Sequence, residues 1–477
     1  MKSLFSYLNW SGFPSPRVLA VLAGSALLAF MAACGGSSST TPPPPANSTV
    51  VQVNLGDAPA DWMLAFSMNV TSMSLTGPGG SVTVADSAKP YEMIHRMGIM
   101  EPIALVAAPR GNYTGASVTI ASCKVSYVDP ASKQLMQQTI NGPFTATIPF
   151  TSSVSVGTTP LSFNFDLDLE HSVTMDDSGK LQFSPVFHHA IGALGGGNGN
   201  GTDARYGGMY QMVGVVSATS SSSFTIIPLQ AAKTFTFQIG SQTQYQGKIS
   251  EMAQLHMGMG VLVTATLQAD GTMLASRVRV TNSATGAMGG GIITSVTGQP
   301  ATQLTLVMQN GAGASVLSDY LSETLTVNLT DSTTYEIDTD RVSLSGLSFT
   351  PVFNASNIYV GQSVLPLSDS AIVPSDTCST SCGTITATTV RLKEQGIRGT
   401  TDVAITPGAS GTFVLTLLPD CAFTSLTGAT EILVYQQTGT NVEDSTAIPA
   451  GTTLRVHGLL FNNGGQWTMI ASTIASS

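Results

Sequence analysis

Two short segments combine methionine with histidine and could bind a soft metal ion. The first contains Met93, His95, Met97 and Met100, and the second contains Met252, His256, Met257 and Met259. Thioether sulfur beside imidazole suits Cu(I) in an oxidising compartment, although methionine is also a common filler of hydrophobic cores. Along an extended strand, Met257 and Met259 would share one face and His256 would lie on the other. We therefore expect structural methionines and no metal site, with copper handling as the alternative.

Carboxylates alternate with apolar residues in the stretch 161–170. Phe163, Phe165, Leu167 and Leu169 fall on one face of a strand, and Asn164, Asp166, Asp168 and Glu170 fall on the other. With Asp176 and Asp177 nearby, the acidic face could supply oxygen ligands for Ca²⁺, but the spacing does not match a calcium loop. We predict a solvated strand face. The adjacent His188 and His189 point to opposite faces of a strand, so they cannot readily share a metal unless the backbone bends.

The N-terminal segment carries the most specific chemical signal. An apolar run of 14 residues at 18–31 follows Lys2 and Arg17; it is too short for a membrane span of about 20 residues but suits a signal peptide. The next residues, Ala32-Ala33-Cys34, complete a sequence that resembles a bacterial lipobox. The resemblance implies that residues 1–33 are removed and that Cys34 is lipidated, and Gly35 after it implies the outer membrane. Residues 34–48, with four prolines at 42–45, are expected to form a tether.

The other cysteines suggest a disulfide. Three residues separate Cys378 from Cys382. In an exported protein a small disulfide is favoured here over a metal site, which would need more ligands. Cys123 and Cys421 are either buried thiols or partners in a long-range bridge.

Recognised catalytic motifs are absent from the sequence. It contains no His-Glu-x-x-His, no Gly-x-Ser-x-Gly, no Walker loop and no Gly-x-Gly-x-x-Gly between a strand and a helix. Six histidines and 28 acidic residues leave room for a site without a motif. We expect no enzymatic activity and no cofactor, with an unrecognised envelope hydrolase as an alternative.

Composition indicates a folded chain with an unusual surface. Charged residues make up 10%, against about 25% in a typical soluble domain, while 42% of residues are hydrophobic. The net charge of −10 argues against binding to nucleic acid or to an anionic membrane surface. Short segments with alternating, β-branched residues dominate between turn signals, which predicts an all-β protein.

Residues 49–191 show a recognisable pattern of turns and strands. Asp57-Ala58-Pro59 suits a turn, Gly111 precedes Tyr113 by two residues, and Phe165-Asp166-Leu167 closes the region. Together these motifs resemble the bacterial lipoprotein family known as domain of unknown function 4382. The resemblance implies a transthyretin-like β-sandwich and no established activity.

A strand pattern then recurs three times. Each copy has an opening strand, a second strand, a glycine turn before a strand (Gly258, Gly361, Gly451) and a closing strand. The pattern resembles the family known as domain of unknown function 5666, which implies small OB-like barrels. We predict copies at 209–285, 286–395 (with insertions) and 396–477. Glycine-rich linkers are expected at 192–208 and 286–291.

These observations predict a sandwich followed by three small barrels, exported and lipid-anchored in the envelope. The expected role is non-enzymatic binding or display. The expected partners are the membrane, through the lipid, and an envelope glycan or protein.

Overall fold

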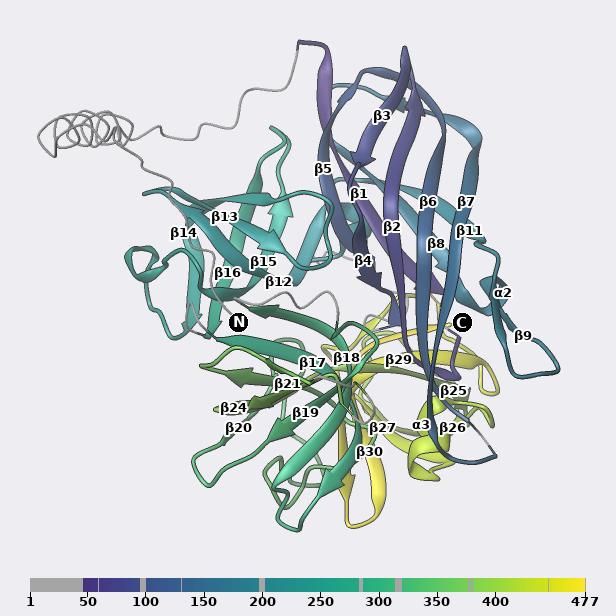
Figure 1. Ribbon diagram of the computed structural model, residues 1–477, viewed down its shortest axis with the longest axis vertical. Coiled ribbons are helices and arrows are strands. Elements are labelled where there is room, and N and C mark those ends of the chain that lie inside the picture. The colour runs from purple at the N-terminus through teal and green to yellow at the C-terminus, as the bar shows by residue number, and fades with distance from the viewer. Residues whose placement is uncertain are drawn as a thin grey trace, which may run out of the picture. The chain divides into compact units, whose positions relative to one another are not determined.

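The computed structural model describes residues 46–58, 60–94, 100–129, 131–196, 202–282, 286–313, 320–375, 378, 381–444 and 446–476. Cys34, His95, Met97 and nearly all of the expected tether therefore lie outside the described residues. The described chain folds almost entirely as strands, which confirms the all-β prediction (Figure 1). No helix within the described ranges has the length and apolar character needed to cross a membrane.

Two sheets form the first part of the fold. The first has the order β11-β8-β1-β5, with β1 (Ser48–Ala58), β5 (Glu101–Pro109), β8 (Leu161–Asp168) and β11 (Phe187–Ala193). The second has the order β3-β2-β6-β7, with β2 (Met63–Gly77), β3 (Gly80–Ala85), β6 (Gly111–Val128) and β7 (Leu135–Val156), and β4 (Lys89–Glu92) pairs with β2. Strand β1 lies between β5, its antiparallel partner, and β8, which runs parallel to it.

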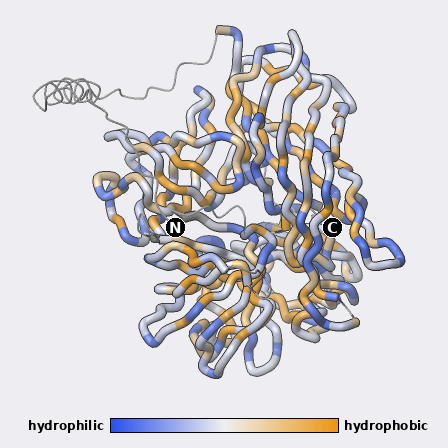
Figure 2. The backbone as a smooth tube through the Cα atoms, in the orientation of Figure 1, coloured by the Kyte–Doolittle hydropathy of each residue, from blue (hydrophilic) through white to orange (hydrophobic). Residues whose placement is uncertain are grey.

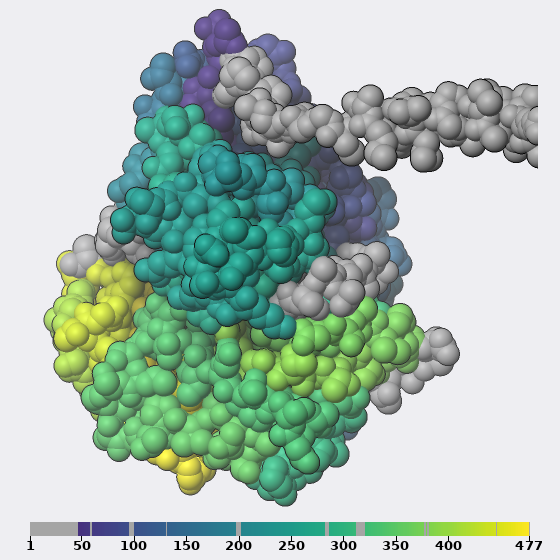
Figure 3. Space-filling model, turned by 90° about the vertical axis from the view of Figure 1, so that its left-hand side faces the viewer, coloured from purple at the N-terminus to yellow at the C-terminus, as the bar shows by residue number. Residues whose placement is uncertain are grey.

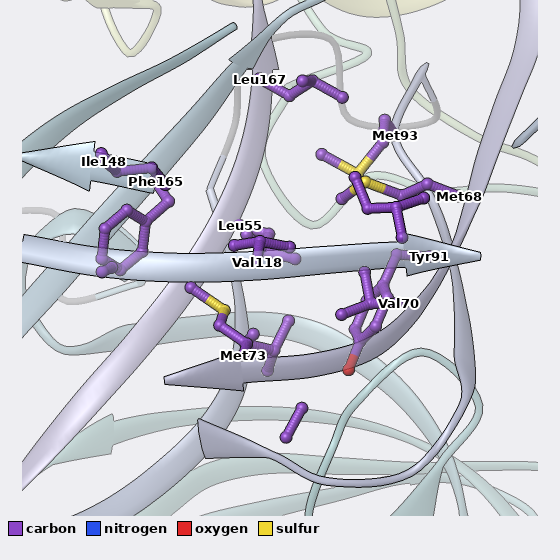
Figure 4. Packing of buried hydrophobic residues seen from close by; sticks show 14 of the residues in the cluster. Leu55, Met68, Val70, Met73, Tyr91, Met93, Val118, Ile148, Phe165 and Leu167 are labelled. Carbon is purple, nitrogen blue, oxygen red and sulfur yellow. The ribbon is translucent and has the colours of Figure 1, made fainter. Parts of the chain in front are cut away.

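Apolar residues from both sheets share one core. Phe163, Phe165 and Leu167 are fully buried, as the alternating pattern predicts, and they join Met68 and Val118 of the second sheet (Figure 4). The same alternation runs along the strands in Figure 2. After β8 the chain forms the short helix α2 (Leu169–Ser172) and the hairpin of β9 (Val173–Met175) and β10 (Leu181–Phe183).

A closed five-stranded barrel follows. Its order is β12-β13-β14-β16-β15, formed by β12 (Gly208–Thr219), β13 (Ser223–Pro228), β14 (Phe235–Gly247), β15 (Gly260–Leu267) and β16 (Met273–Asn282). Strands β14 and β16 run parallel, and the other pairs are antiparallel. Phe224, Phe235 and Phe237 fill the interior, where the rings of Phe224 and Phe237 stack with centroids 5.1 Å apart.

The third copy repeats this order of pairings. It consists of β25 (Gln395–Thr401), β26 (Gly411–Leu417), β27 (Glu431–Gln436), β28 (Asn441–Val442), β29 (Thr453–Asn463) and β30 (Gln466–Ser476), with helix α3 (Ala422–Thr427) before β27. Strand β25 pairs with β26 and β29, β26 pairs with β27, and β30 closes the barrel against β27 and β29. The parallel pair again joins the third and fifth strands.

The second copy has the same order with divided strands. It comprises β17 (Ala287–Thr297), β18 (Gln303–Gly313), β19 (Thr324–Asn328), β20 (Thr334–Ile337), β21 (Ser363–Ser368), β22 (Val373–Pro374), β23 (Gly383–Thr386) and β24 (Thr389–Leu392). Strand β19 pairs in parallel with β23, and β20 pairs in parallel with β24. Strands β19 and β20 therefore correspond to the third strand of the first barrel, and β23 and β24 correspond to its fifth strand. The segment 338–362 is an insertion between β20 and β21.

Neither glycine-rich stretch is a simple linker. Residues 287–291 belong to β17, and a Cβ at Gly291 would collide with the carbonyl oxygen of Val307. Residues 192–193 belong to β11, and a Cβ at Gly192 would collide with the carbonyl oxygen of Arg205. Residues 197–201 lie outside the described residues. At both described positions glycine permits close backbone approach, so the linker prediction was wrong there.

Candidate functional site

Three described methionines of the two segments, Met93, Met252 and Met259, pack against hydrophobic cores. Met93 is 5% exposed and belongs to the same sandwich core as Met68 (Figure 4). Met259 is partly buried against the first barrel's core and accepts a hydrogen bond from the backbone N–H of His256 at 3.4 Å. Met257 is 65% exposed, because a turn at Gly258 (φ +86°) separates it from β15. The shared face expected for Met257 and Met259 is therefore not formed.

The cysteines adopt two different states. Cys378 and Cys382 form a disulfide. Cys123 and Cys421 are buried free thiols, which removes the long-range bridge as an alternative. Burial raises the pKa of the Cys421 thiol to about 11 and also raises that of Cys123.

The acidic face of β8 is not simply solvated. Asn164 is 2% exposed and accepts a hydrogen bond from Asn54 Nδ2 at 2.6 Å. Asp168 accepts hydrogen bonds from His171 and His188, which come from α2 and β11. His189 points the other way and stacks on Phe150, with ring centroids 4.7 Å apart. Sequence reasoning missed His171, since nothing in the pattern indicates that α2 turns it back toward Asp168.

An open groove of about 560 Å³ lies on the third barrel. It is lined by Val414, Thr427, Gly428, Ala429, Thr430, Glu431, Leu433, Gly465, Gln466 and Trp467. The groove thus covers the second and third strands of the barrel (β26 and β27) and the turn between the fourth and fifth (β29 and β30). OB-type barrels bind oligonucleotides and oligosaccharides at this face and at the adjoining loops.

A tight turn and two aromatic contacts position Trp467, the aromatic residue of the groove. Gly464 (φ +61°) and Gly465 (φ +97°) form the two-residue turn between the paired residues Asn463 and Gln466. Trp467 follows directly and is partly exposed. Its ring meets Phe423 and Tyr359 edge to face, with centroids 5.0 and 6.0 Å away. Glu431 is the one charged residue among the described residues that line the groove.

A buried charge network joins the first two copies. Asp338, which is 3% exposed, accepts hydrogen bonds from Lys393 Nζ and from Gln211 Nε2. Burial favours the neutral acid, but the nearby Lys393 and Arg391 outweigh it and lower the pKa of Asp338. Asp340 pairs with Arg277 of β16 at 2.6 Å. Figure 3 shows the first barrel (teal) packed directly against the second copy (green).

Arg341 extends this network to the third copy. It donates to Thr473 Oγ1 of β30 at 2.7 Å, lies 3.6 Å from the carboxylate of Glu394, and covers the ring of Tyr210 at 5.1 Å. A cavity of about 100 Å³ lies beside these residues. The segment 338–341 therefore contacts all three copies. The charged run Glu336–Arg341 stands out in a chain with so few charges, and this signal could have revealed the network.

A second buried ion pair joins the sandwich to the third barrel. Asp61 lies 3.1 Å from Arg398 of β25, and its carbonyl oxygen accepts a hydrogen bond from the Ala422 N–H at 2.7 Å. Burial raises the pKa of Asp61 to about 6 despite Arg398, and the carboxylates of Asp420 and Glu170 add to the rise. The raised pKa means that the folded protein binds a proton at Asp61 more tightly than the unfolded chain does. Asp61 therefore contributes more to folding stability when it is protonated than when it is charged.

The contribution of Asp61 to stability should therefore fall as pH rises from 4 to 7. The stabilisation from Asp61 is complete below its unfolded pKa of 3.8 and is lost as pH rises through about 6, a change on the order of 2–3 kcal/mol. Urea unfolding of the wild type and of Asp61→Asn measures this. The variant should lose the Asp61-dependent part of the decline, whereas the exposed-site control Asp86→Asn should keep it. An equal decline in Asp61→Asn would contradict the assignment.

One barrel matches a known family. Residues 213–279, from β12 to β16, match the family described as Domain of unknown function (DUF5666). The resemblance expected for the repeats is confirmed for the first copy.

Other comparisons add little. No curated protein matches the chain. The crystal structure of wild-type single-stranded DNA binding protein from Thermus aquaticus is similar over 40% of this chain and 92% of that one, with 11% identity and a TM-score of 0.13. A score this low carries no argument about fold or function.

Proposed function

We propose that this chain is a lipid-anchored, non-enzymatic protein of the bacterial outer membrane that binds an envelope glycan through the groove on the third barrel. The lipobox-like sequence ending at Cys34 supports the anchor. The motifs that resemble domain of unknown function 4382, a lipoprotein family, support the same setting for the sandwich.

The groove carries the glycan proposal. Its volume of about 560 Å³ lies within the range of about 300–1,000 Å³ that is usual for ligand sites, which is enough room for a short oligosaccharide. A partly exposed indole offers an apolar face for a sugar ring, and Thr430 and Gln466 offer neutral hydrogen-bonding groups. With Glu431 as the one charge in the lining, a neutral, hydroxyl-rich ligand fits better than a nucleic acid.

Tryptophan fluorescence provides a direct test. The chain has three tryptophans, of which Trp10 precedes Cys34, so a soluble protein starting at Pro44 contains Trp62 and Trp467. Titration with soluble oligomers of N-acetylglucosamine and with maltohexaose should change the emission, with a Kd below about 1 mM for at least one of them. Gln466→Ala should weaken binding about tenfold, because its side chain is exposed in the groove.

The controls separate binding from folding. Trp62→Phe should leave the titration intact, since Trp62 packs on Tyr127 in the sandwich, with ring centroids 5.4 Å apart. Trp467→Phe should abolish the signal while the circular dichroism spectrum is retained. A response that persists in Trp467→Phe but vanishes in Trp62→Phe would place the ligand on the sandwich and refute the groove.

A further inference from the structure

Two imidazoles share one carboxylate oxygen at the end of β8. Asp168 Oδ2 lies 2.8 Å from His171 Nδ1 and 3.3 Å from His188 Nε2. The other oxygen, Oδ1, accepts the backbone N–H of His171 at 3.1 Å, because Asp168 is the N-cap of α2. The carboxylate is therefore held in place with Oδ2 directed at both rings.

A second carboxylate lies beside this group. Asp166 is two residues earlier on the same face of β8, and His188 is its direct partner across the ladder with β11. The Oδ1 atom of Asp166 is buried and accepts no hydrogen bond from any described residue. A buried acceptor without a donor is costly, which points to a missing partner at this position.

We propose that Asp168, His171 and His188 bind a divalent transition metal of the Zn²⁺ type, with Asp166 as an adjacent carboxylate. Two imidazoles and a carboxylate form a common ligand set for zinc, which leaves a position for water or a further ligand. Imidazole nitrogen makes the set a poor one for Ca²⁺ or Mg²⁺, which prefer oxygen. This inference is independent of the groove and of any glycan.

The separations already approach those of a coordinated ion. Ligand atoms bound at about 2.0–2.1 Å in a tetrahedral site lie roughly 3.3 Å from one another; the His188–Asp168 distance is already 3.3 Å, and the His171–Asp168 distance of 2.8 Å must lengthen by about 0.5 Å. Among the described residues no three His, Cys, Asp or Glu side chains are yet arranged around a common point. The two rings must therefore exchange their hydrogen bonds to Asp168 for coordination. The side chains of His171 and His188 are 72% and 64% exposed, so few packing contacts oppose a rotation of the two rings.

Calorimetric titration of the soluble protein from Pro44 with ZnCl₂ tests the site. We expect one ion per chain with a Kd in the micromolar range and an increase in Tm. His171→Ala and His188→Ala should each weaken binding at least tenfold, while His256→Ala, at an exposed histidine of the first barrel, should leave it unchanged. Both site histidines are exposed, so these variants should keep the wild-type circular dichroism spectrum.

Three results would overturn the proposal. The first is the absence of zinc binding tighter than about 100 μM. The second is binding that both histidine variants retain, and the third is equal affinity for CaCl₂, which would mean that carboxylates alone bind the ion.

Discussion

Lys393→Met should lower the free energy of unfolding by about 3–5 kcal/mol. Lys393 Nζ donates to Asp338 Oδ2 and to Gln211 Oε1 in the interior of the junction between the first two copies. The substitution removes the cation and leaves the carboxylate of Asp338 buried without its closest countercharge. The remaining hydrogen-bond donors, Gln211 Nε2 at 3.2 Å and the backbone N–H of Asp340 at 3.4 Å, are neutral and cannot replace the cation. Urea unfolding at pH 7.5 measures the loss.

Matched variants show whether burial causes the effect. Lys248 pairs with Asp369 at 2.6 Å, but the two side chains are 49% and 51% exposed, so Lys248→Met should cost less than about 1 kcal/mol. Asp338→Asn combined with Lys393→Met should recover part of the loss, because no unpaired charge remains. Similar costs for Lys393→Met and Lys248→Met would show that the buried network contributes little.

Cys34→Ser should release the protein from membranes completely. The sequence before Cys34 resembles a lipobox, and a serine hydroxyl cannot form the thioether to the lipid. Palmitate labelling and membrane flotation of cells that express the wild type and the variant measure the change. Cys123→Ser, at a buried thiol of the sandwich, is the control and should keep the label. Unchanged labelling of Cys34→Ser would remove the lipoprotein proposal.

The strand pattern was readable from sequence because it is local. Phe163, Phe165 and Leu167 alternate with polar residues, and each lies in the core as the period of two requires. The recurring turns likewise indicated small barrels, which form in the first and third copies, whereas the strands of the second copy form an eight-stranded sheet. The linker prediction for the glycine-rich stretches was wrong because glycine is common both in flexible linkers and where two backbone segments pack closely. Only the position of the neighbouring backbone distinguishes these two cases.

The contacts between buried polar side chains could not be predicted from the sequence in the same way. Gln211 meets Asp338 across 127 positions of sequence, and Arg205 meets Glu443 across 238. Such partners are brought together by the packing of domains, so no local periodicity encodes them. His171 and His188, in contrast, meet Asp168 within the sandwich, one through the turn of α2 and the other across the pairing of β8 with β11. Sequence supplied the residue types, and tertiary contacts decide which of them cooperate.

The central position of β1 bears on how the protein would carry mechanical load. An anchor at Cys34 would pull on the chain just before Ser48, where β1 begins. Because β1 runs parallel to β8 from Val51 to Ala58 and antiparallel to β5 on its other side, that pull acts along the strand on both ladders at once. Hydrogen bonds loaded in shear must break together, whereas those of a peeled edge strand break one after another. If Cys34 is anchored, a pull on it would therefore load the sandwich in shear, the direction in which many hydrogen bonds must break at once.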